Sequence, residues 1–545
     1  MEEIDFIPGT TRLVEDHDHA ATSHLKKHGD IILSPQPTNS PNDPLNWSLP
    51  RRCWHAALLC FVTALTAATS NDAGSAQDGM NTDLGISYNA MNTGAGVLFI
   101  GIGYFTLLIS PAAWLYGRRI TFLICIFLGA MGAIWFARVQ STEDSIWNQL
   151  FVGASEACAE ANVQLSLSEV FYSHQRGAVL GVYVLSTSIG TYLGPLIGGF
   201  VADRIGWRWI GWLSVIISLG TVVVLFFTLE ETLFDRSAYD VGTIDGVHQT
   251  GDTPHPHHSE NEKTADLNKS HSPSDVPAES SMEKKKTYWQ RIQLITLAPN
   301  VVGTGFKQYI SRLLHTLRVF TFPAVLYSGL QWGAQDAWLT FYLTLEESNW
   351  FGPPWNYSDV GTGLMNIPTL IGAVIGCFWG GWFSDLFVAW YAKRFRKGIR
   401  EAEDRLWMMY PCAIISPVGM LLFGIGTAYG WNWLAPYVGL GFIGFGWGCA
   451  GDLSMAYLMD AYPEMVLEGM VGVAVVNNTL ACLFTFTASD WLGGGVDSVR
   501  NCMIEIAVLD FVFVMLTVPM MLYGKKCRRW TLKRYEDFVR IRDTL

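Results

Sequence analysis

The sequence predicts an all-α integral membrane protein with about twelve transmembrane helices in two pseudo-symmetric halves of six helices each. Three observations predict this fold class: long apolar blocks, a polar segment that divides them into two groups, and an alternation of charge between the connections. Of the 545 residues, 50% are hydrophobic and only 15% are charged, whereas a soluble domain carries about 25% charged residues. Apolar residues concentrated in long blocks indicate membrane spans.

About twelve apolar blocks are long enough for a helix that crosses a hydrocarbon core of roughly 30 Å. Because backbone groups in lipid must form hydrogen bonds within their own segment, we expect every block to be a helix. The first six blocks lie near residues 53–71, 93–114, 119–138, 147–169, 178–201 and 208–229. The last six lie near residues 317–343, 361–384, 406–428, 433–457, 468–488 and 502–523.

A long polar stretch separates the two groups of spans. It contains Thr-Pro-His-Pro-His-His and Glu-Lys-Lys-Lys with almost no apolar run, which is typical of a disordered linker. Its histidines could bind a metal, but nothing nearby completes a ligand set, so we expect no metal site at His255, His257 and His258. The predicted division is therefore a tail (1–50), a first half (51–230), a largely disordered linker (231–310), a second half (311–525) and a second tail (526–545).

Charge alternates from one connection to the next through all predicted spans. One set of connections is basic, as at Arg118–Arg119 and Lys393–Arg394, and the other set is acidic, as at Asp72 and Asp78. Because basic connections stay in the cytoplasm, we expect both termini and the linker to be cytoplasmic.

Four sequons for N-glycosylation occur in the chain, and their predicted locations differ. Only Asn356-Tyr-Ser falls in a predicted outer loop, where a glycan can be attached. The sequons at Asn46, Asn268 and Asn477 fall in cytoplasmic or membrane segments, so we expect them to be unmodified.

The predicted fifth span carries glycines at a fixed spacing. Gly190, Gly194 and Gly198 lie on one helical face, which permits a neighbouring backbone to approach closely. Pro195 removes a backbone donor and is expected to kink the helix. We expect Gly194 and Pro195 to shape this helix at the interface between the halves. The complete run consists of Gly181, Gly190, Gly194, Pro195, Gly198 and Gly199.

The chain resembles transporters of the major facilitator superfamily. The glycine run matches the antiporter signature of that superfamily at every fixed position, and Tyr116-Gly-Arg-Arg119 resembles the end of its cytoplasmic loop motif. Asp43-Pro-Leu-Asn-Trp47 and Gly206-Trp-Arg-Trp209 resemble fungal members, closest to the branch of drug:proton antiporters and polyamine transporters. The resemblance implies alternating access, in which the two halves rock about a cavity at the membrane midplane.

The same resemblance implies a cytoplasmic gate made of Gly117, Arg118, Arg119 and Asp385. Three positions depart from the pattern of the superfamily, and the first is Ser110, which stands where the loop motif has its first glycine. Trp114 stands where the loop motif normally carries an aspartate, and Gln149 stands where many proton antiporters carry an arginine. Proton coupling through that arginine is therefore not supported by the sequence.

Charged residues inside spans cost roughly 2.5–3.5 kcal/mol on insertion scales, so they are candidates for function. In the fourth span, Glu156, Glu160 and Gln164 follow one another at intervals of one helical turn. We expect this polar stripe to face the interior, where repulsion between the two carboxylates favours binding of a proton or a cation. The candidates for the substrate and proton path are Glu156, Glu160, Gln164, Asp336, Asp452 and Asn478.

Three functions are compatible with these features. The leading prediction is proton-coupled efflux of a small organic compound, such as a drug, a toxin or a secondary metabolite. The alternative is import of a nutrient or a polyamine cation, because an acidic stripe attracts cations. A membrane solute sensor is the minor alternative. Sensors usually append a signalling domain or a long tail, whereas the predicted tail here is short (526–545).

No enzymatic site is predicted. The spans contain almost no histidine, and the chain has no Gly-x4-Gly-Lys-Ser/Thr phosphate loop, so neither catalysis nor ATP-driven transport is indicated. We therefore expect a monomer without cofactor, metal or nucleic acid, whose partners are a small-molecule substrate, protons and the lipid bilayer. The expected location is the cell membrane, with the vacuolar membrane as the alternative.

Overall fold

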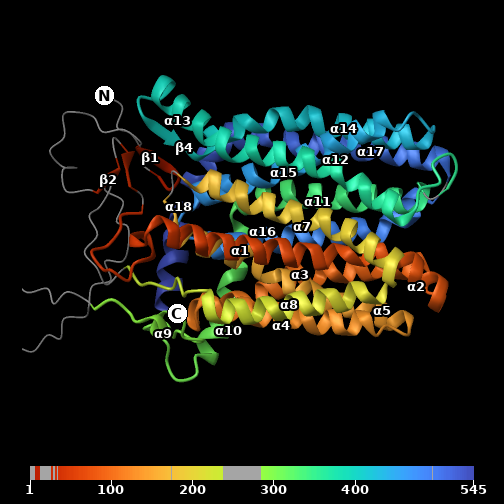
Figure 1. Ribbon diagram of the computed structural model, residues 1–545. Coiled ribbons are helices and arrows are strands. Elements are labelled where there is room, and N and C mark those ends of the chain that lie inside the picture. The colour runs from red at the N-terminus through yellow and green to blue at the C-terminus, as the bar shows by residue number, and fades with distance from the viewer. Residues whose placement is uncertain are drawn as a thin grey trace, which may run out of the picture.

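The computed structural model describes residues 7–12, 26–28, 31–33, 35–172, 175–236, 284–350, 352–493 and 495–545. Long helices run side by side along one axis and form a single bundle (Figure 1). The histidines of the predicted linker, His255, His257 and His258, lie outside the described residues, and so does the sequon at Asn268.

The first half of the chain forms eight α-helices. Ser87 and Ser141 cap two of them by accepting hydrogen bonds from the backbones of Ala90 and Asp144. The helices are α1 (Leu49–Asn71), α2 (Gln77–Leu84), α3 (Tyr88–Leu115), α4 (Arg118–Ala137), α5 (Thr142–Cys158), α6 (Gln164–Val170), α7 (Arg176–Ile205) and α8 (Arg208–Thr228). A 3-10 turn, η3 (Asp72–Ala76), follows α1, and a π-helical turn, η4 (Ala159–Val163), joins α5 to α6.

The second half begins with two short helices and continues with eight longer ones. These are α9 (Tyr288–Arg291), α10 (Phe306–Thr316), α11 (Pro323–Asn349), α12 (Asp359–Phe378), α13 (Ser384–Phe395), α14 (Tyr410–Ala428), α15 (Leu434–Ala461), α16 (Val466–Leu492), α17 (Val496–Met515) and α18 (Thr517–Thr544). Three non-α turns complete it: η6 (Leu317–Thr321), the π-helical η7 (Trp379–Phe383) and η8 (Ala402–Met409). Residues 284–310, which belong to the predicted linker, thus include α9 and the start of α10.

The all-α membrane fold is confirmed. In the described part of the chain, ten helical stretches are long and apolar enough to span a membrane, and an eleventh results if α10–η6 and α11 count as one bent span. All twelve predicted blocks fall on helices. The predicted span outside this count is the fourth, α5–η4–α6, because polar residues such as Glu156, Glu160 and Gln164 lower its mean hydropathy.

The two halves meet along two seams. Within the halves, α1 packs on α7 and α12 packs on α15; between them, α7 packs on α12 and α3 packs on α16. The start of α1, α13 and the C-terminal helix α18 lie at one end of the bundle, and α2 lies at the other (Figure 1). We call these the termini end and the α2 end.

Short strands and a buried arginine connect distant segments at the termini end. Strand β1 (Thr10–Arg12) pairs with β4 (Ile399–Glu401), and β2 (Lys27–His28) pairs with β3 (Ile31–Ile32). Arg528 of α18 donates to Glu401 at 2.9 Å and to Glu403 at 2.5 Å. Burial raises the pKa of Glu401, but hydrogen bonds from Lys525, Arg528 and Thr10 outweigh it and hold that pKa below its usual value.

The glycine stripe of α7 packs within its own half. A Cβ atom would lie 2.1 Å from the carbonyl oxygen of Ala64 at Gly190 and 2.7 Å from that of Ala68 at Gly194, and at Gly198 it would lie 3.0 Å from Oγ of Ser75. These neighbours belong to α1 and η3. Helix α7 lies at the interface between the halves, and its glycine stripe is turned toward α1 of its own half. The signature residues Pro195 and Gly199 are also buried in α7.

Candidate functional site

Three acidic side chains from both halves meet in the middle of the bundle. Glu156 of α5 and Asp336 of α11 are buried, and Glu160 of the π-helical turn η4 is half-buried. Their charges interact with one another, and no cationic group acts on them in the described part of the chain. A π-helical turn inside a helix is frequent at functional sites. The structure therefore brings together three of the predicted path residues as an acidic cluster without a counter-charge.

Aromatic side chains lie beside Asp336 of this acidic cluster. The indole nitrogen of Trp447 in α15 donates a hydrogen bond of 2.9 Å to Oδ1 of Asp336. The ring of Trp447 lies 4.6 Å from that of Trp332 and 6.1 Å from that of Tyr192, which comes from the first half. Aromatic faces attract cations through their quadrupole. Together with the carboxylates, they form a site whose chemistry suits an organic cation.

Gln164 and Asn478 are placed differently from these acids. Gln164 of α6 is buried, and its Nε2 lies 3.9 Å from Sδ of Met455 in α15, so it reaches the other half. Asn478 of α16 donates a hydrogen bond of 2.8 Å to the carbonyl of Ala474 in its own helix. It also lies against Gly103 of α3, where an added Cβ would come within 2.9 Å of the asparagine Cβ. Asn478 therefore contributes to packing along the α3–α16 seam.

A cavity of about 160 Å³ lies between the halves toward the α2 end. Its walls include Gln149 and Pro195 from the first half and Glu346 and Asn366 from the second. Gln149, which replaces the arginine of many antiporters, donates a hydrogen bond of 2.9 Å to Oδ1 of Asn148. At the α2 end, the interface between the halves is thus partly open.

At the termini end, the halves are in close contact. Oδ2 of Asp385 in α13 accepts a hydrogen bond of 2.9 Å from the backbone nitrogen of Ala178 in α7, which joins the two halves directly. Oδ1 of the same carboxylate accepts a hydrogen bond of 2.7 Å from Arg405. Gly181 of α7 and Gly381 of η7 allow the backbones to approach, since a Cβ on Gly181 would lie 3.2 Å from Cα of Gly381.

Asp452 of α15 lies beneath this contact and is fully buried. Among the described residues, neither of its carboxylate oxygens has a hydrogen-bond partner. A Cβ on Gly381 would lie 2.9 Å from Oδ2 of Asp452, and a Cβ on Gly181 would lie 3.1 Å from the same oxygen. The carboxyl group is thus enclosed by backbone at the contact between the halves.

The four predicted gate residues do not form one cluster. The backbone nitrogens of Arg118 and Arg119, which follow Gly117 at the start of α4, donate to Glu231 at 3.0 and 3.1 Å. The side chain of Arg118 binds Glu169 at 2.7 Å, and that of Arg119 binds the carbonyls of Ile292 and Phe226. Asp385 has different partners among the described residues, namely Ala178 and Arg405. The carboxylate of Glu231 accepts hydrogen bonds from the free backbone amides at the start of α4. This contact fixes the position of Arg118 and Arg119.

Trp114, which replaces the aspartate of the loop motif, is surrounded by arginines. The guanidinium of Arg118 lies 4.6 Å from the centre of its ring, that of Arg542 lies 5.0 Å away, and that of Arg312 lies 5.8 Å away. These arginines come from α4, α18 and α10. Trp114 therefore attracts positive charge, as a carboxylate does, but through its ring face.

Replacing Trp114 by leucine is expected to lower the free energy of unfolding by about 1–3 kcal/mol, because several cation–π contacts are lost while an apolar side chain remains. Thermal melting of the purified protein measures the effect. Trp530→Leu is the matched control, since among the described residues this exposed tryptophan meets a single guanidinium, that of Arg534, at 4.5 Å. Equal losses of stability in the two variants would contradict the role of Trp114.

The sequons also occupy different environments. Asn356 is exposed in the connection between α11 and α12. Asn46 is engaged, because its Nδ2 donates to the carbonyls of Thr38 and Ser40 at 2.9 and 2.8 Å. Asn477 is fully buried in α16. Asn356 and Asn46 are both exposed, but the amide nitrogen of Asn46 is held by its two hydrogen bonds, so Asn356 is the better placed of the three for modification.

Sequence reasoning did not identify Arg405 and Trp447. Arg405 follows three acidic residues, Glu401, Glu403 and Asp404, directly before an apolar block, and such a position could have indicated a partner for an acid. Trp447 had no distinctive signal, because it is one of 22 tryptophans, most of which are expected to pack or to lie at membrane interfaces.

Comparisons with known proteins agree with this architecture. The family model described as Major Facilitator Superfamily matches residues 57–486. An MFS-type transporter of Schizosaccharomyces pombe is 52% identical over 99% of this chain and 96% of its own length. Protein HOL1 of Saccharomyces cerevisiae is 49% identical over 99% of this chain and 98% of its own length. MFS antiporter QDR3 of Candida albicans is 24% identical over 77% of this chain and 71% of its own length. The chain therefore belongs to the Major Facilitator Superfamily, and it is a multi-pass membrane transporter of small molecules rather than an enzyme.

Proposed function

We propose that this chain carries a small organic cation across the membrane by alternating access, in exchange for protons. The observation that supports the proposal is the acidic cluster of Glu156, Glu160 and Asp336, which has no basic partner in the described part of the chain. Uncompensated carboxylates at membrane depth are costly. A cationic substrate or bound protons would remove that cost, and the aromatic rings beside Asp336 favour a cation that also has apolar surface.

The proposed cycle uses the two seams. Residues 51–230 and 311–525 would rock as two halves about the acidic cluster. The closed contact of Asp385 with Ala178 at the termini end, together with the cavity at the α2 end, fits a state that is open at the α2 end. Closing this cavity and parting Gly181 from Gly381 would expose the cluster to the termini end.

The proposed orientation places both termini in the cytoplasm, as the charge of the connections indicates. The α2 end would then face the outside of the cell membrane, where Asn356 would be accessible for glycosylation. Protons would be carried by the path acids, among which Asp452 has both oxygens unpartnered among the described residues. A neutral carboxyl group costs less than a charged one in such a place. We propose that the chain works as a monomer.

Export is the proposed direction. The glycine run of α7 matches the antiporter signature, and a distant relative in Candida albicans is named an antiporter. Both support the drug:proton antiporter branch and efflux of a drug, a toxin or a secondary metabolite.

Import of a nutrient or polyamine cation is the second candidate. It is favoured by the acidity of the path, which attracts cations, and by Gln149, which lacks the charge of the arginine found in many proton antiporters.

Transport assays in intact cells test the proposal. With a panel of labelled organic cations, Asp336→Asn and Glu160→Gln are each expected to weaken transport by at least about 30-fold, because a buried partner of the bound charge is lost. Glu505→Gln is the matched control, since Glu505 accepts an exposed hydrogen bond of 2.9 Å from Trp491. A proton uncoupler should abolish the part of transport that the proton gradient drives.

Assays in the same cells also reveal the direction of transport. Increased retention of the cation in cells without the protein indicates export, and loss of uptake indicates import. Equal retention and equal uptake with and without the protein, across cations of different size, would refute cation transport.

A further inference from the structure

A second cavity, of about 200 Å³, lies at the termini end, away from the transport path. Four basic residues line it: Arg51 at the start of α1, Lys285 and Lys286 before α9, and Arg291 at the end of α9. The other walls come from residues 41–47, 231–233 and 290–296. The cavity therefore unites the start of the first span with the segment that precedes α10.

Positive charge prevails in this basic pocket. Glu231 lines it, but its carboxylate already accepts hydrogen bonds from the backbones of Arg118 and Arg119. Glu230 forms salt bridges with both Arg51 and Arg291. Lys285 and Lys286 are exposed, and neither forms a salt bridge within the described part of the chain. The two lysines are thus available to an anion.

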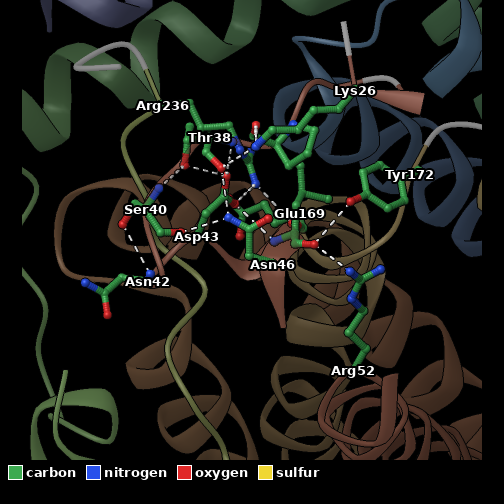
Figure 2. Close-up of polar contacts among 12 residues, drawn as sticks. Lys26, Thr38, Ser40, Asn42, Asp43, Asn46, Arg52, Glu169, Tyr172 and Arg236 are labelled. Carbon is green, nitrogen blue, oxygen red and sulfur yellow. Dashed lines mark hydrogen bonds and ion pairs between the residues drawn. The ribbon is translucent and has the colours of Figure 1, made fainter. Parts of the chain in front are cut away.

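One wall of the basic pocket is held by a network of hydrogen bonds (Figure 2). The buried carboxylate of Asp43 accepts bonds of 3.0 Å from the backbone nitrogens of Thr38 and Leu45, and it pairs with Arg236 at 3.1 Å. Its neighbour Asn42 donates to the carbonyl of Lys284 at 3.2 Å and accepts from the backbone nitrogen of Lys286 at 2.9 Å. This network positions the lysine segment before any ligand binds.

The chain beyond the pocket has the character of a membrane-surface element. Helix α10 with η6 is bent by 84° from α11, so it lies nearly at right angles to a span. One face of it exposes large apolar side chains, with Phe306 exposed by 70% and Leu314 by 61%, whereas Arg312 and His315 on the other face are buried against the bundle. Trp289 in α9 is exposed by 70%. This distribution is typical of an amphipathic helix at the boundary between headgroups and acyl chains.

We propose that the basic pocket binds the phosphate-bearing headgroup of an anionic membrane lipid, whose acyl chains lie along the apolar faces of α9 and α10. Lysine and arginine are the residues that bind phosphate. The exposed apolar side chains beside the pocket favour a lipid over a free phosphate ion. This inference goes beyond solute transport and rests on the proposed orientation, in which the termini end meets the anionic cytoplasmic leaflet.

Thermal stability of the purified full-length protein in vesicles or nanodiscs tests the inference. The probes are phosphatidylcholine alone, phosphatidylcholine with phosphatidylserine, phosphatidylcholine with phosphatidylinositol phosphate, and inorganic phosphate added to phosphatidylcholine. We expect anionic lipid, but not inorganic phosphate, to raise the melting temperature. Lys285→Gln with Lys286→Gln should weaken the apparent lipid affinity roughly 30-fold.

Lys393→Gln with Arg394→Gln is the matched control, because it removes the same charge from exposed positions of α13 at the same end of the bundle. The control should respond to lipid like the unchanged protein. Equal weakening in both double variants would overturn the proposal in favour of a diffuse basic surface. An equal rise of the melting temperature with inorganic phosphate would overturn the proposal in favour of a site for free anions. A melting temperature that does not change with anionic lipid would show that the pocket binds no such lipid. None of these outcomes depends on transport of a cation.

Discussion

Replacing Arg405 by methionine is expected to destabilise the protein by about 3–5 kcal/mol, because it leaves buried carboxylates without their counter-charge. The side chain of Arg405 is fully buried. It donates to Asp385 at 2.7 Å, to Asp460 at 3.2 Å and to Oγ of Ser384 at 2.6 Å. A methionine fills a similar volume but supplies none of these bonds.

The loss should fall on the closed termini end in particular. Asp385 also accepts the hydrogen bond from the backbone of Ala178, so the carboxylate that loses its arginine is the one that joins the two halves. Asp460 keeps a second partner, Arg400, whereas Asp385 keeps only bonds to uncharged groups among those described. Transport should therefore be lost together with stability.

Thermal melting of the purified variant, compared with transport in cells, measures both effects. Arg500→Met is the control, because Arg500 forms an exposed pair with Asp497 at 3.0 Å, and an exposed pair contributes at most about 1 kcal/mol. If Arg405→Met and Arg500→Met had the same melting temperature, the bonds of Arg405 to Asp385 and Asp460 could not be what holds the termini end closed.

The sequence predicted the parts of this fold that depend on composition. All twelve predicted apolar blocks fall on helices, including α5–η4–α6, whose polar stripe was interpreted as facing the interior. That stripe does place Glu156 and Glu160 beside Asp336, because lipid would exclude these carboxylates whatever the partner helix.

The sequence could not predict the features that depend on how each helix is rotated about its axis. The spacing of Gly190, Gly194 and Gly198 predicted that another helix approaches α7 closely. Because α1 and α12 both pack on α7, only the folded structure shows that α1 is the helix in contact with these glycines. Likewise, Arg118 and Asp385 were each expected at a gate. Their actual partners, Glu169 and Arg405, lie 51 and 20 residues away along the chain, so neither pairing follows from local sequence.

Replacing Gly181 by leucine is expected to shift the protein away from the state that is closed at the termini end. A Cβ at this position would lie 3.1 Å from the carbonyl oxygen of Cys377, 3.1 Å from Oδ2 of Asp452 and 3.2 Å from Cα of Gly381. Two of these neighbours are backbone atoms of the other half, which cannot give way without parting the halves. Overpacking of this kind costs about 1–3 kcal/mol, which corresponds to roughly a five- to 150-fold shift in the equilibrium.

All three atoms nearest to that Cβ belong to the second half, so the strain falls on the contact between the halves, and the variant should fold and express while its transport falls. Reaction of a cysteine introduced by Ala178→Cys with a water-soluble thiol reagent reports the opening, since the backbone of Ala178 is held against Asp385 in the closed state. The reaction should be faster in the Gly181→Leu background. Gly220→Leu in α8 is the matched control, because a Cβ there has no neighbour within 4 Å. Unchanged labelling together with normal transport in Gly181→Leu would show that the halves separate along a different seam.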